Sequence, residues 1–230
     1  GGNQLWRNLR DGTFEDITKA AGVAVATTIS VTASFADIDN DGDPDLYVTV
    51  IRDGNRLFEN DGTGKFTDIS ARSGLNYKGH SSGALFFDYN NDGLLDLFLA
   101  NIGNYTTEVA IPAKTYNADA NQEIEYEYYI GLEDAFHGHL KPERTEQSVL
   151  FKNEGDKRFV DVSAQSRLQD SSWSGDASAL DANEDGWLDL YVLNMQGHDH
   201  YYENVQGKYF SDKSHEVFPR TPWGTMGVKV

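Results

Sequence analysis

A repeat of about 51 residues is the feature that most constrains how this chain folds. Four short phrases, QLWRN, RLFEN, VLFKN and HYYEN, end in Asn8, Asn60, Asn153 and Asn204. Each Asn is followed six residues later by Phe, eight later by Asp and ten later by Ser or Thr. The intervals between the Asn residues are 52, 93 and 51, so the middle copy carries about 42 additional residues. A period near 50 is typical of a propeller blade with four short strands.

Within one unit the pattern indicates strand, acidic turn, strand, turn, strand, glycine turn and strand. In the first complete copy we expect strands at 31–36, 46–51, 56–59 and 65–69. Apolar residues dominate these segments, as they do in sheets covered on both faces. Ser70 followed by Gly74 predicts a one-turn helix with Ser70 as its N-cap and the glycine at its carboxyl end.

The predicted fold class is therefore all-β: a β-propeller of four-stranded blades with one long insertion. About three and a half blades are expected here, as part of a seven- or eight-bladed ring. The predicted division assigns 1–22 to the end of a preceding blade, 23–75 to a complete blade and 76–168 to a blade with the insertion at 101–147. It assigns 169–218 to another complete blade and 219–230 to the first strand of the next.

Three acidic turns share the pattern D-x-[DN]-x-D-G-x-x-D at the same place in the repeat. They span 37–45, 88–96 and 181–189. Their side chains offer only oxygen, which favours Ca²⁺ over Mg²⁺ and disfavours zinc. The glycine at position 6 permits the positive φ that folds a chain around an ion. An EF-hand would need Glu at position 12, where Val48, Leu99 and Val192 stand instead.

We therefore predict three calcium sites, one in each turn, with side-chain ligands at positions 1, 3, 5 and 9 and a backbone carbonyl at position 7. The predicted ligands are Asp37, Asp39, Asp41, Asp43 and Asp45; Asp88, Asn90, Asp92, Leu94 and Asp96; and Asp181, Asn183, Asp185, Trp187 and Asp189. The alternative is that these are acidic turns without a metal.

The phrases FADIDNDGDPDLYV, FFDYNNDGLLDLFLAN and LDANEDGWLDLYVLN resemble the FG-GAP/VCBS repeats of calcium-loop propellers related to the integrin α-subunit head. Together with GLEDAFHGHL, PERTEQSVLFKN and NMQGHDHYYEN, they look like the bacterial ASPIC/UnbV-type branch, which is similar to cartilage acidic protein. The resemblance implies a calcium-binding propeller. It implies little about activity, because one fold carries many functions.

Charge and composition limit the partners. The chain has 37 acidic and 19 basic residues and a formal charge of −18, so nucleic acid and anionic membranes are disfavoured as partners. The longest uncharged stretch, 21–36, is shorter than the roughly 20 residues that a membrane helix needs. The absence of Cys fits an exported bacterial protein as well as a cytoplasmic one. Loops of this kind suit the millimolar calcium found outside cells, so we expect a secreted, periplasmic or cell-surface location.

Two further features have open interpretations. The insertion at 101–147 contains five tyrosines, Tyr105, Tyr116, Tyr126, Tyr128 and Tyr129, which suit either a sugar or protein binding surface or a structural flap. The pairs His137/His139 and His198/His200 could converge on a transition metal. Polar loop residues that hydrogen-bond to the backbone are the favoured interpretation.

The sequence contains no G-x-S-x-G motif, no Cys and no phosphate-binding glycine loop, so we expect no catalytic residues. The predicted function is a non-catalytic, calcium-binding scaffold for binding or adhesion, with a protein or glycan ligand. Two alternatives remain: a carbohydrate-active, lyase-like enzyme whose site includes the insertion, and an accessory subunit of a larger extracellular assembly.

Overall fold

The computed structural model describes residues 2–25, 28–104, 111–117, 122–128, 144–222 and 224–228. For 111–117 and 122–128 it describes the backbone alone. Across these ranges, no helix combines the length and the apolar character needed to span a bilayer.

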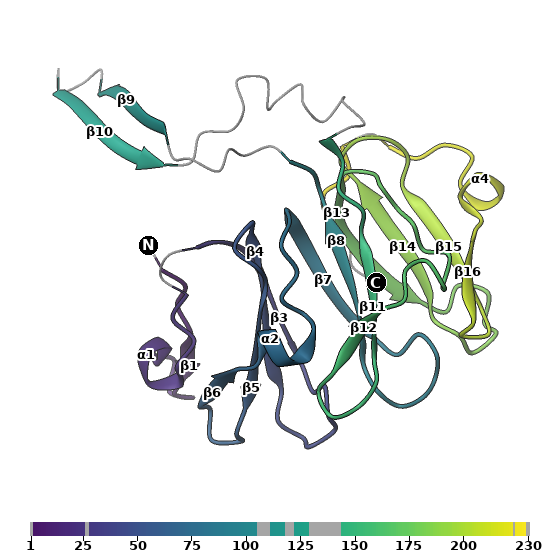
Figure 1. The fold of residues 1–230 in the computed structure, drawn as a ribbon, viewed down its shortest axis with the longest axis horizontal. Coiled ribbons are helices and arrows are strands. Elements are labelled where there is room, and N and C mark those ends of the chain that lie inside the picture. The colour runs from purple at the N-terminus through teal and green to yellow at the C-terminus, as the bar shows by residue number, and fades with distance from the viewer. Residues whose placement is uncertain are drawn as a thin grey trace.

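Three four-stranded antiparallel sheets follow one another along the chain (Figure 1). The first contains β3 (Ile29–Ala36), β4 (Asp45–Ile51), β5 (Arg56–Asn60) and β6 (Phe66–Asp68). The second contains β7 (Ser81–Phe87), β8 (Asp96–Asn101), β11 (Val149–Asn153) and β12 (Phe159–Asp161). The third contains β13 (Ser174–Leu180), β14 (Asp189–Asn194), β15 (His200–Val205) and β16 (Tyr209–Asp212). This all-β architecture is that of a partial β-propeller, as predicted from the repeat.

Two shorter hairpins accompany the sheets. The first pairs β1 (Trp6–Asn8) with β2 (Phe14–Asp16), which align in the repeat with β5 and β6. The second pairs β9 (Ile111–Asn117) with β10 (Gln122–Tyr128) and belongs to the insertion. Because β8 pairs directly with β11, the insertion enters the second sheet between strands that remain neighbours.

The three sheets repeat one another in detail. The first two strands of each sheet carry a register shift at the same place, between Ser30 and Ala33, between Ser81 and Gly83, and between Ser174 and Asp176. Each last strand is followed by an irregular or one-turn helical segment; the one-turn helices here are α2 (Ser70–Ser73) and α4 (Ser214–Val217). A similar turn, α1 (Thr18–Ala21), follows β2.

The expected N-cap role of Ser70 is wrong, although Gly74 does end the helix in the left-handed conformation with φ 83°. The N-cap position is Ile69, without a side-chain cap. The Ser70 hydroxyl instead accepts the backbone N–H of Leu57 at 2.9 Å and lies in hydrogen-bond contact with Asp68. A bond to the neighbouring strand has therefore replaced the local cap.

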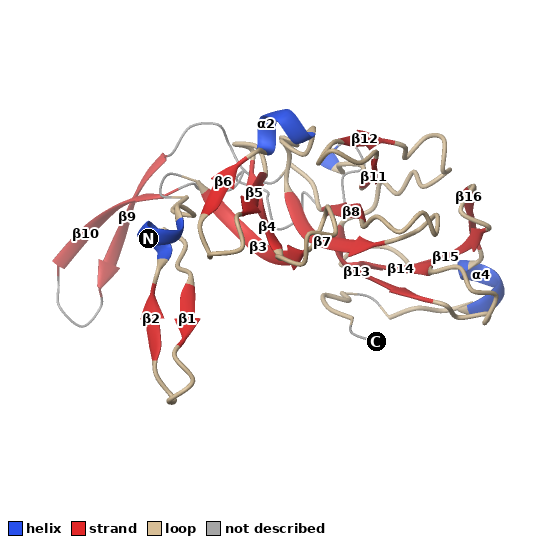
Figure 2. Ribbon diagram, turned by 90° about the horizontal axis from the view of Figure 1, so that it is seen from below, coloured by secondary structure: helices blue, strands red, loops and turns tan. Residues whose placement is uncertain are grey.

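The hydrophobic core lies between successive sheets, which the views in Figures 1 and 2 show side by side in chain order. One cluster joins the first and second sheets, and includes Tyr47, Leu57, Leu97 and Leu99. Another joins the second and third sheets, and includes Phe98, Leu150, Leu190 and Val192. A third lies between the β1–β2 segment and the first sheet. Every residue of β4 and of β8 is buried, which explains why these strands lack alternating polarity.

The final residues contact the third sheet without forming a strand. No strand is assigned within 219–222 or 224–228, the described parts of the segment expected to begin the next blade. The Thr225 hydroxyl nevertheless donates to Asp199 Oδ2 at 3.1 Å. The proposed division into blades remains a prediction.

Candidate metal centre

The three acidic turns connect the first two strands of the three sheets. We call them loop 1 (37–45, between β3 and β4), loop 2 (88–96, between β7 and β8) and loop 3 (181–189, between β13 and β14). The ninth residue of each loop, Asp45, Asp96 or Asp189, is also the first residue of the following strand. The repeat therefore places all three turns at equivalent positions in the fold.

The first aspartate of each loop folds the turn around its carboxylate. In loop 1, Asp37 Oδ1 accepts the N–H of Asp41 at 3.1 Å, and Asp37 Oδ2 accepts the N–H of Gly42 at 3.0 Å. Asp88 and Asp181 make the same pairs of bonds in loops 2 and 3 at 2.9 to 3.2 Å. All three turns therefore share one backbone shape.

This shape needs two residues with positive φ. The predicted one is the glycine at position 6, with φ of 91°, 85° and 87° in loops 1 to 3. The second is position 4, where Asn40, Asn91 and Glu184 have φ of 61°, 55° and 59°. Asparagine tolerates the left-handed region better than most residues, so two of the three loops carry a well-suited residue there.

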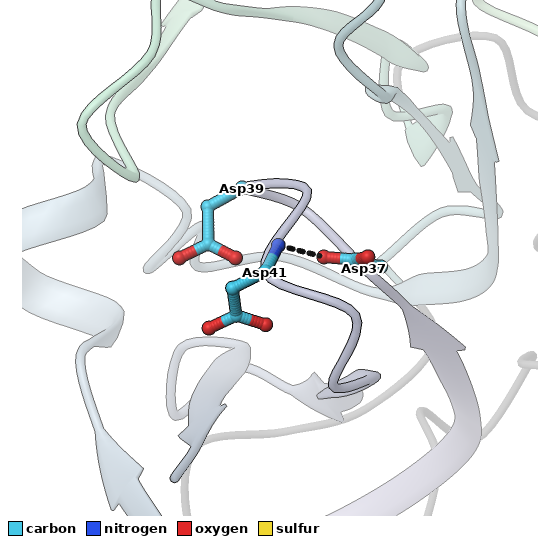
Figure 3. Close-up of side chains that lie close together, drawn as sticks. All are labelled: Asp37, Asp39 and Asp41. Carbon is cyan, nitrogen blue, oxygen red and sulfur yellow. Dashed lines mark hydrogen bonds between the residues drawn. The ribbon is translucent and has the colours of Figure 1, made fainter. Parts of the chain in front are cut away.

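Loop 1 gathers three carboxylates. Oxygen atoms of Asp37, Asp39 and Asp41, one from each residue, all lie within 4.8 Å of one another (Figure 3). Asp39 Oδ1 is buried and has no hydrogen-bond partner among the described residues. An all-oxygen cluster with an unpartnered buried carboxylate oxygen fits a hard cation such as Ca²⁺.

Loops 2 and 3 have a different arrangement at positions 3 and 5. In loop 2 the amide of Asn90 donates to Asp92 Oδ2 at 2.9 Å, and Asn90 Oδ1 accepts the Asp92 N–H at 3.1 Å. Asn183 and Asp185 form the same pair in loop 3 at 3.1 and 3.0 Å. At the third position, loops 2 and 3 therefore offer an amide oxygen in place of the Asp39 carboxylate of loop 1.

The residue at position 7 contributes a backbone bond to each turn. The N–H groups of Asp43, Leu94 and Trp187 donate to the position-5 aspartate at 2.9, 3.0 and 3.0 Å. The Asp43 side chain is half-buried beside Gly62. Metal ligation by the fifteen predicted residues remains a prediction.

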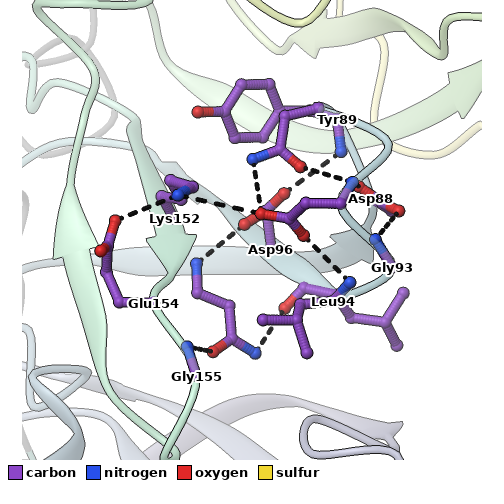
Figure 4. Close-up of polar contacts among 12 residues, drawn as sticks. Asp88, Tyr89, Gly93, Leu94, Asp96, Lys152, Glu154 and Gly155 are labelled. Carbon is purple, nitrogen blue, oxygen red and sulfur yellow. Dashed lines mark hydrogen bonds and ion pairs between the residues drawn. The ribbon is translucent and has the colours of Figure 1, made fainter.

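The aspartate at position 9 is buried in each loop. Asp96 is fully buried, and its carboxylate accepts the N–H of Tyr89 at 3.2 Å and the N–H of Asn153 at 2.8 Å (Figure 4). Asp45 and Asp189 make equivalent bonds in loops 1 and 3. Burial raises the pKa of Asp96 to about 7, and the nearby Asp92 and Asp88 carboxylates add to this effect.

This raised pKa predicts a pH dependence in metal-stripped protein. A carboxyl group whose pKa is higher in the folded than in the unfolded chain favours folding at low pH, and that contribution is lost as the pH rises toward 7. Between pH 5 and pH 8 we expect the unfolding free energy to fall by on the order of 2–3 kcal/mol. Urea unfolding of chelator-treated protein at several pH values measures it. The same series on Asp96→Asn is the control, and an equally steep decline in that variant would contradict the assignment to Asp96.

Asparagine side chains link each loop to the neighbouring sheet. Asn153, fully buried at the end of β11, donates to Ile38 O in loop 1 at 2.8 Å and to Leu95 O in loop 2 at 3.2 Å. Asn204 of the third sheet likewise donates to Tyr89 O in loop 2 at 2.7 Å. The repeated Asn thus fastens each of these sheets to the loop of the sheet before it.

The fourth residue of the loop links the loops in the opposite direction. The amide of Asn40 in loop 1 donates to Gly93 O in loop 2 at 2.9 Å, and that of Asn91 donates to Gly186 O in loop 3 at 3.1 Å. Neither set of bonds between loops and neighbouring sheets was predicted, because the repeated Asn served only to align the copies. The recurrence of Asn at these fixed positions in the repeat was the available signal.

Two lysines of the second sheet approach the loops. Lys157, in the turn between β11 and β12, places its Nζ 2.7 Å from Asp39 Oδ2 and pairs also with Glu59. Lys152 Nζ lies 3.8 Å from Asp92 Oδ2 and 3.2 Å from Glu154. Neither lysine was singled out from the sequence, because both lie far from these aspartates along the chain.

The structure separates the histidines of the second pair. His200 Nδ1 lies 3.2 Å from Asp212 Oδ2, whereas His198 Nδ1 lies 3.5 Å from Thr221 Oγ1 and its ring contacts that of His215. The expectation of loop residues bonded to the backbone therefore differs from the structure: His200 begins β15, and the ring contacts of both histidines are to side chains. His137, His139, Tyr105 and Tyr129 lie outside the described residues, as do the side chains of Tyr116, Tyr126 and Tyr128.

Comparison with known proteins finds a repeat family. The FG-GAP-like repeat matches residues 1–48 and 37–99. A search of curated proteins found no match. A solved structure of a lectin from Agrocybe aegerita, described as recognising non-reducing terminal N-acetylglucosamine, is 15% identical, with a TM-score of 0.29. The match covers 90% of this chain and spans 59% of the lectin chain.

Proposed function

Residues 1–99 of this chain match FG-GAP-like repeats, and from this premise we propose that the protein is a calcium-stabilised propeller that acts as a binding scaffold. Each calcium ion would bind in one acidic loop and offset the repulsion among its carboxylates. The bound ion would also hold the first two strands of a blade together. The proposed role of the metal is structural, and we propose no catalytic residues.

One observation carries this proposal: three loops in three sheets share the backbone bonds made by their first and fifth residues, and each loop has side-chain oxygens at positions 1, 3, 5 and 9. Loop 1 adds the cluster of Asp37, Asp39 and Asp41 with an unpartnered oxygen of Asp39. Hard oxygen ligands in a flexible turn suit Ca²⁺ better than Mg²⁺, which demands tighter octahedral geometry.

Isothermal titration calorimetry of metal-stripped protein tests the proposal. We expect three calcium ions per chain, and two per chain in each of the single variants Asp41→Ala, Asp92→Ala and Asp185→Ala. Asp61→Ala is the matched control, because Asp61 lies in an exposed turn and bonds to Thr63 rather than to a loop. This variant should still bind three ions. Absence of calcium binding to the unmodified protein would refute the proposed function.

We further propose that the scaffold works outside the cell, where millimolar calcium would keep such loops filled. Its ligand would be a protein or a glycan, with the tyrosine-containing insertion at 101–147 as the candidate contact surface. A panel of glycans, followed by analysis of the products, tests whether the protein binds a glycan and whether it converts it. Binding without turnover supports a scaffold, whereas new reducing or unsaturated ends would show an enzyme.

A further inference from the structure

We propose that Lys157 is an internal cation that competes with calcium for Asp39 and so sets the affinity of loop 1. This inference rests on the proposed calcium sites and adds a residue that lies outside the loop motif. Its consequence is that calcium binding at loop 1 exchanges an ion pair between two neighbouring sheets for a metal ion.

The geometry places the Lys157 ammonium group against a predicted calcium ligand. Its Nζ lies 2.7 Å from Asp39 Oδ2 and pairs with Glu59 from the end of β5, so one lysine of the second sheet joins two carboxylates of the first. The side chains of Lys157 and Asp39 are only 18% and 19% exposed. Although partial burial works against the charged form, bonds to both carboxylates raise the Lys157 pKa, so the ammonium stays charged.

The same carboxylate belongs to the acidic cluster of loop 1. Asp39 contributes an oxygen to the group of three with Asp37 and Asp41. A calcium ion bound there would draw on the negative charge that the ammonium already neutralises. Two cations that share one partly buried carboxylate weaken each other, because their mutual repulsion is poorly screened away from solvent.

A lysine paired with the third position of the loop is found in loop 1 alone among the three loops, whereas Lys152 approaches the position-5 carboxylate of Asp92 in loop 2 at 3.8 Å. Asp39 is the only charged residue at the third position, since loops 2 and 3 carry Asn90 and Asn183 there. The lysine equivalent to Lys157 in the third sheet is Lys208, two residues before the repeated Phe, and its Nζ bonds to Gln206 Oε1 at 3.3 Å. Loop 1 is thus the most acidic of the three loops, with five aspartates, and it is also the loop that pairs with Lys157.

The test compares calcium affinities of the full chain with those of Lys157→Gln, measured by competition with a chromophoric chelator. We expect one of the three sites to bind calcium about tenfold more tightly in the variant, because the variant lacks the positive charge that shares the Asp39 carboxylate with the ion. Lys208→Gln is the matched control and should leave all three affinities unchanged. Unchanged or weaker binding in Lys157→Gln would overturn the proposal and leave Lys157 as a structural tie between sheets.

A second pair of variants assigns the effect to loop 1. In Asp39→Asn the shared carboxylate is gone, so adding Lys157→Gln should no longer tighten any site. A tenfold gain that persists in the Asp39→Asn background would also overturn the proposal. If the unmodified chain binds no calcium, the proposed function is refuted. If it binds three ions and the affinities do not respond to Lys157→Gln, only the competition between Lys157 and calcium is refuted.

Discussion

Removing calcium should lower the melting temperature of this protein by about 20 °C. If each of three sites is saturated at about 100 times its dissociation constant, each stabilises the fold by about 2.7 kcal/mol, or about 8 kcal/mol together. For a chain of this size, 1 kcal/mol corresponds to roughly 2–4 °C. The formal charge of −18 adds carboxylate repulsion once the ions are gone. Thermal unfolding followed by circular dichroism, in millimolar calcium and in EGTA, measures the shift.

Magnesium serves as the control for this experiment. At the same concentration it should restore little of the lost stability, because it binds poorly to flexible oxygen loops of this size. Restoring calcium should recover the original midpoint. Midpoints within about 2 °C of each other in calcium and EGTA would contradict a structural role for the metal.

Replacing Asn153 with Ala should destabilise the protein by about 4 kcal/mol, because the side chain satisfies three backbone groups. It donates to Ile38 O at 2.8 Å and to Leu95 O at 3.2 Å, and it accepts the Gly155 N–H at 3.0 Å. Asn153 is fully buried, so its loss would leave these groups short of partners and open a small cavity. Chemical denaturation in saturating calcium measures the change.

Asn60 provides a matched control at the equivalent position of the first sheet. Its amide donates to Pro44 O at 3.1 Å, its oxygen accepts the Gly62 N–H at 3.2 Å, and the described residues give it no bond to a preceding sheet. Asn60→Ala should therefore cost only about 1 kcal/mol. Equal losses in the two variants would show that the bond between neighbouring sheets contributes nothing.

The sequence predicted the fold because its constraints repeat. The 51-residue period indicated four-stranded sheets, and Gly42, Gly93 and Gly186 marked the loops by a requirement for positive φ that the structure confirms. The predicted strand boundaries differ from the observed ones by one or two residues. For example, β3 begins at Ile29 rather than at residue 31.

Contacts that do not repeat escaped prediction. The pair of Lys157 with Asp39 joins different sheets, and the described part of the third sheet has no counterpart of it. The bonds of Asn153 do recur, at Asn204, but they end on backbone carbonyls, so the repeated Asn marked a position without showing its partners. Ser70 shows the opposite error: a hydroxyl before a short helix suggested a cap, and a tertiary bond to Leu57 prevailed.

The placement of the apolar clusters affects how the molecule loses its structure. Each cluster lies between two neighbouring segments of the array, so the folding energy is a sum over nearest neighbours, as in repeat proteins. A loss at one end of such an array need not spread directly to the other, because each sheet is coupled to the rest through its neighbours. The free energies of unfolding predicted above therefore include the coupling between neighbouring sheets as well as the stability of each sheet.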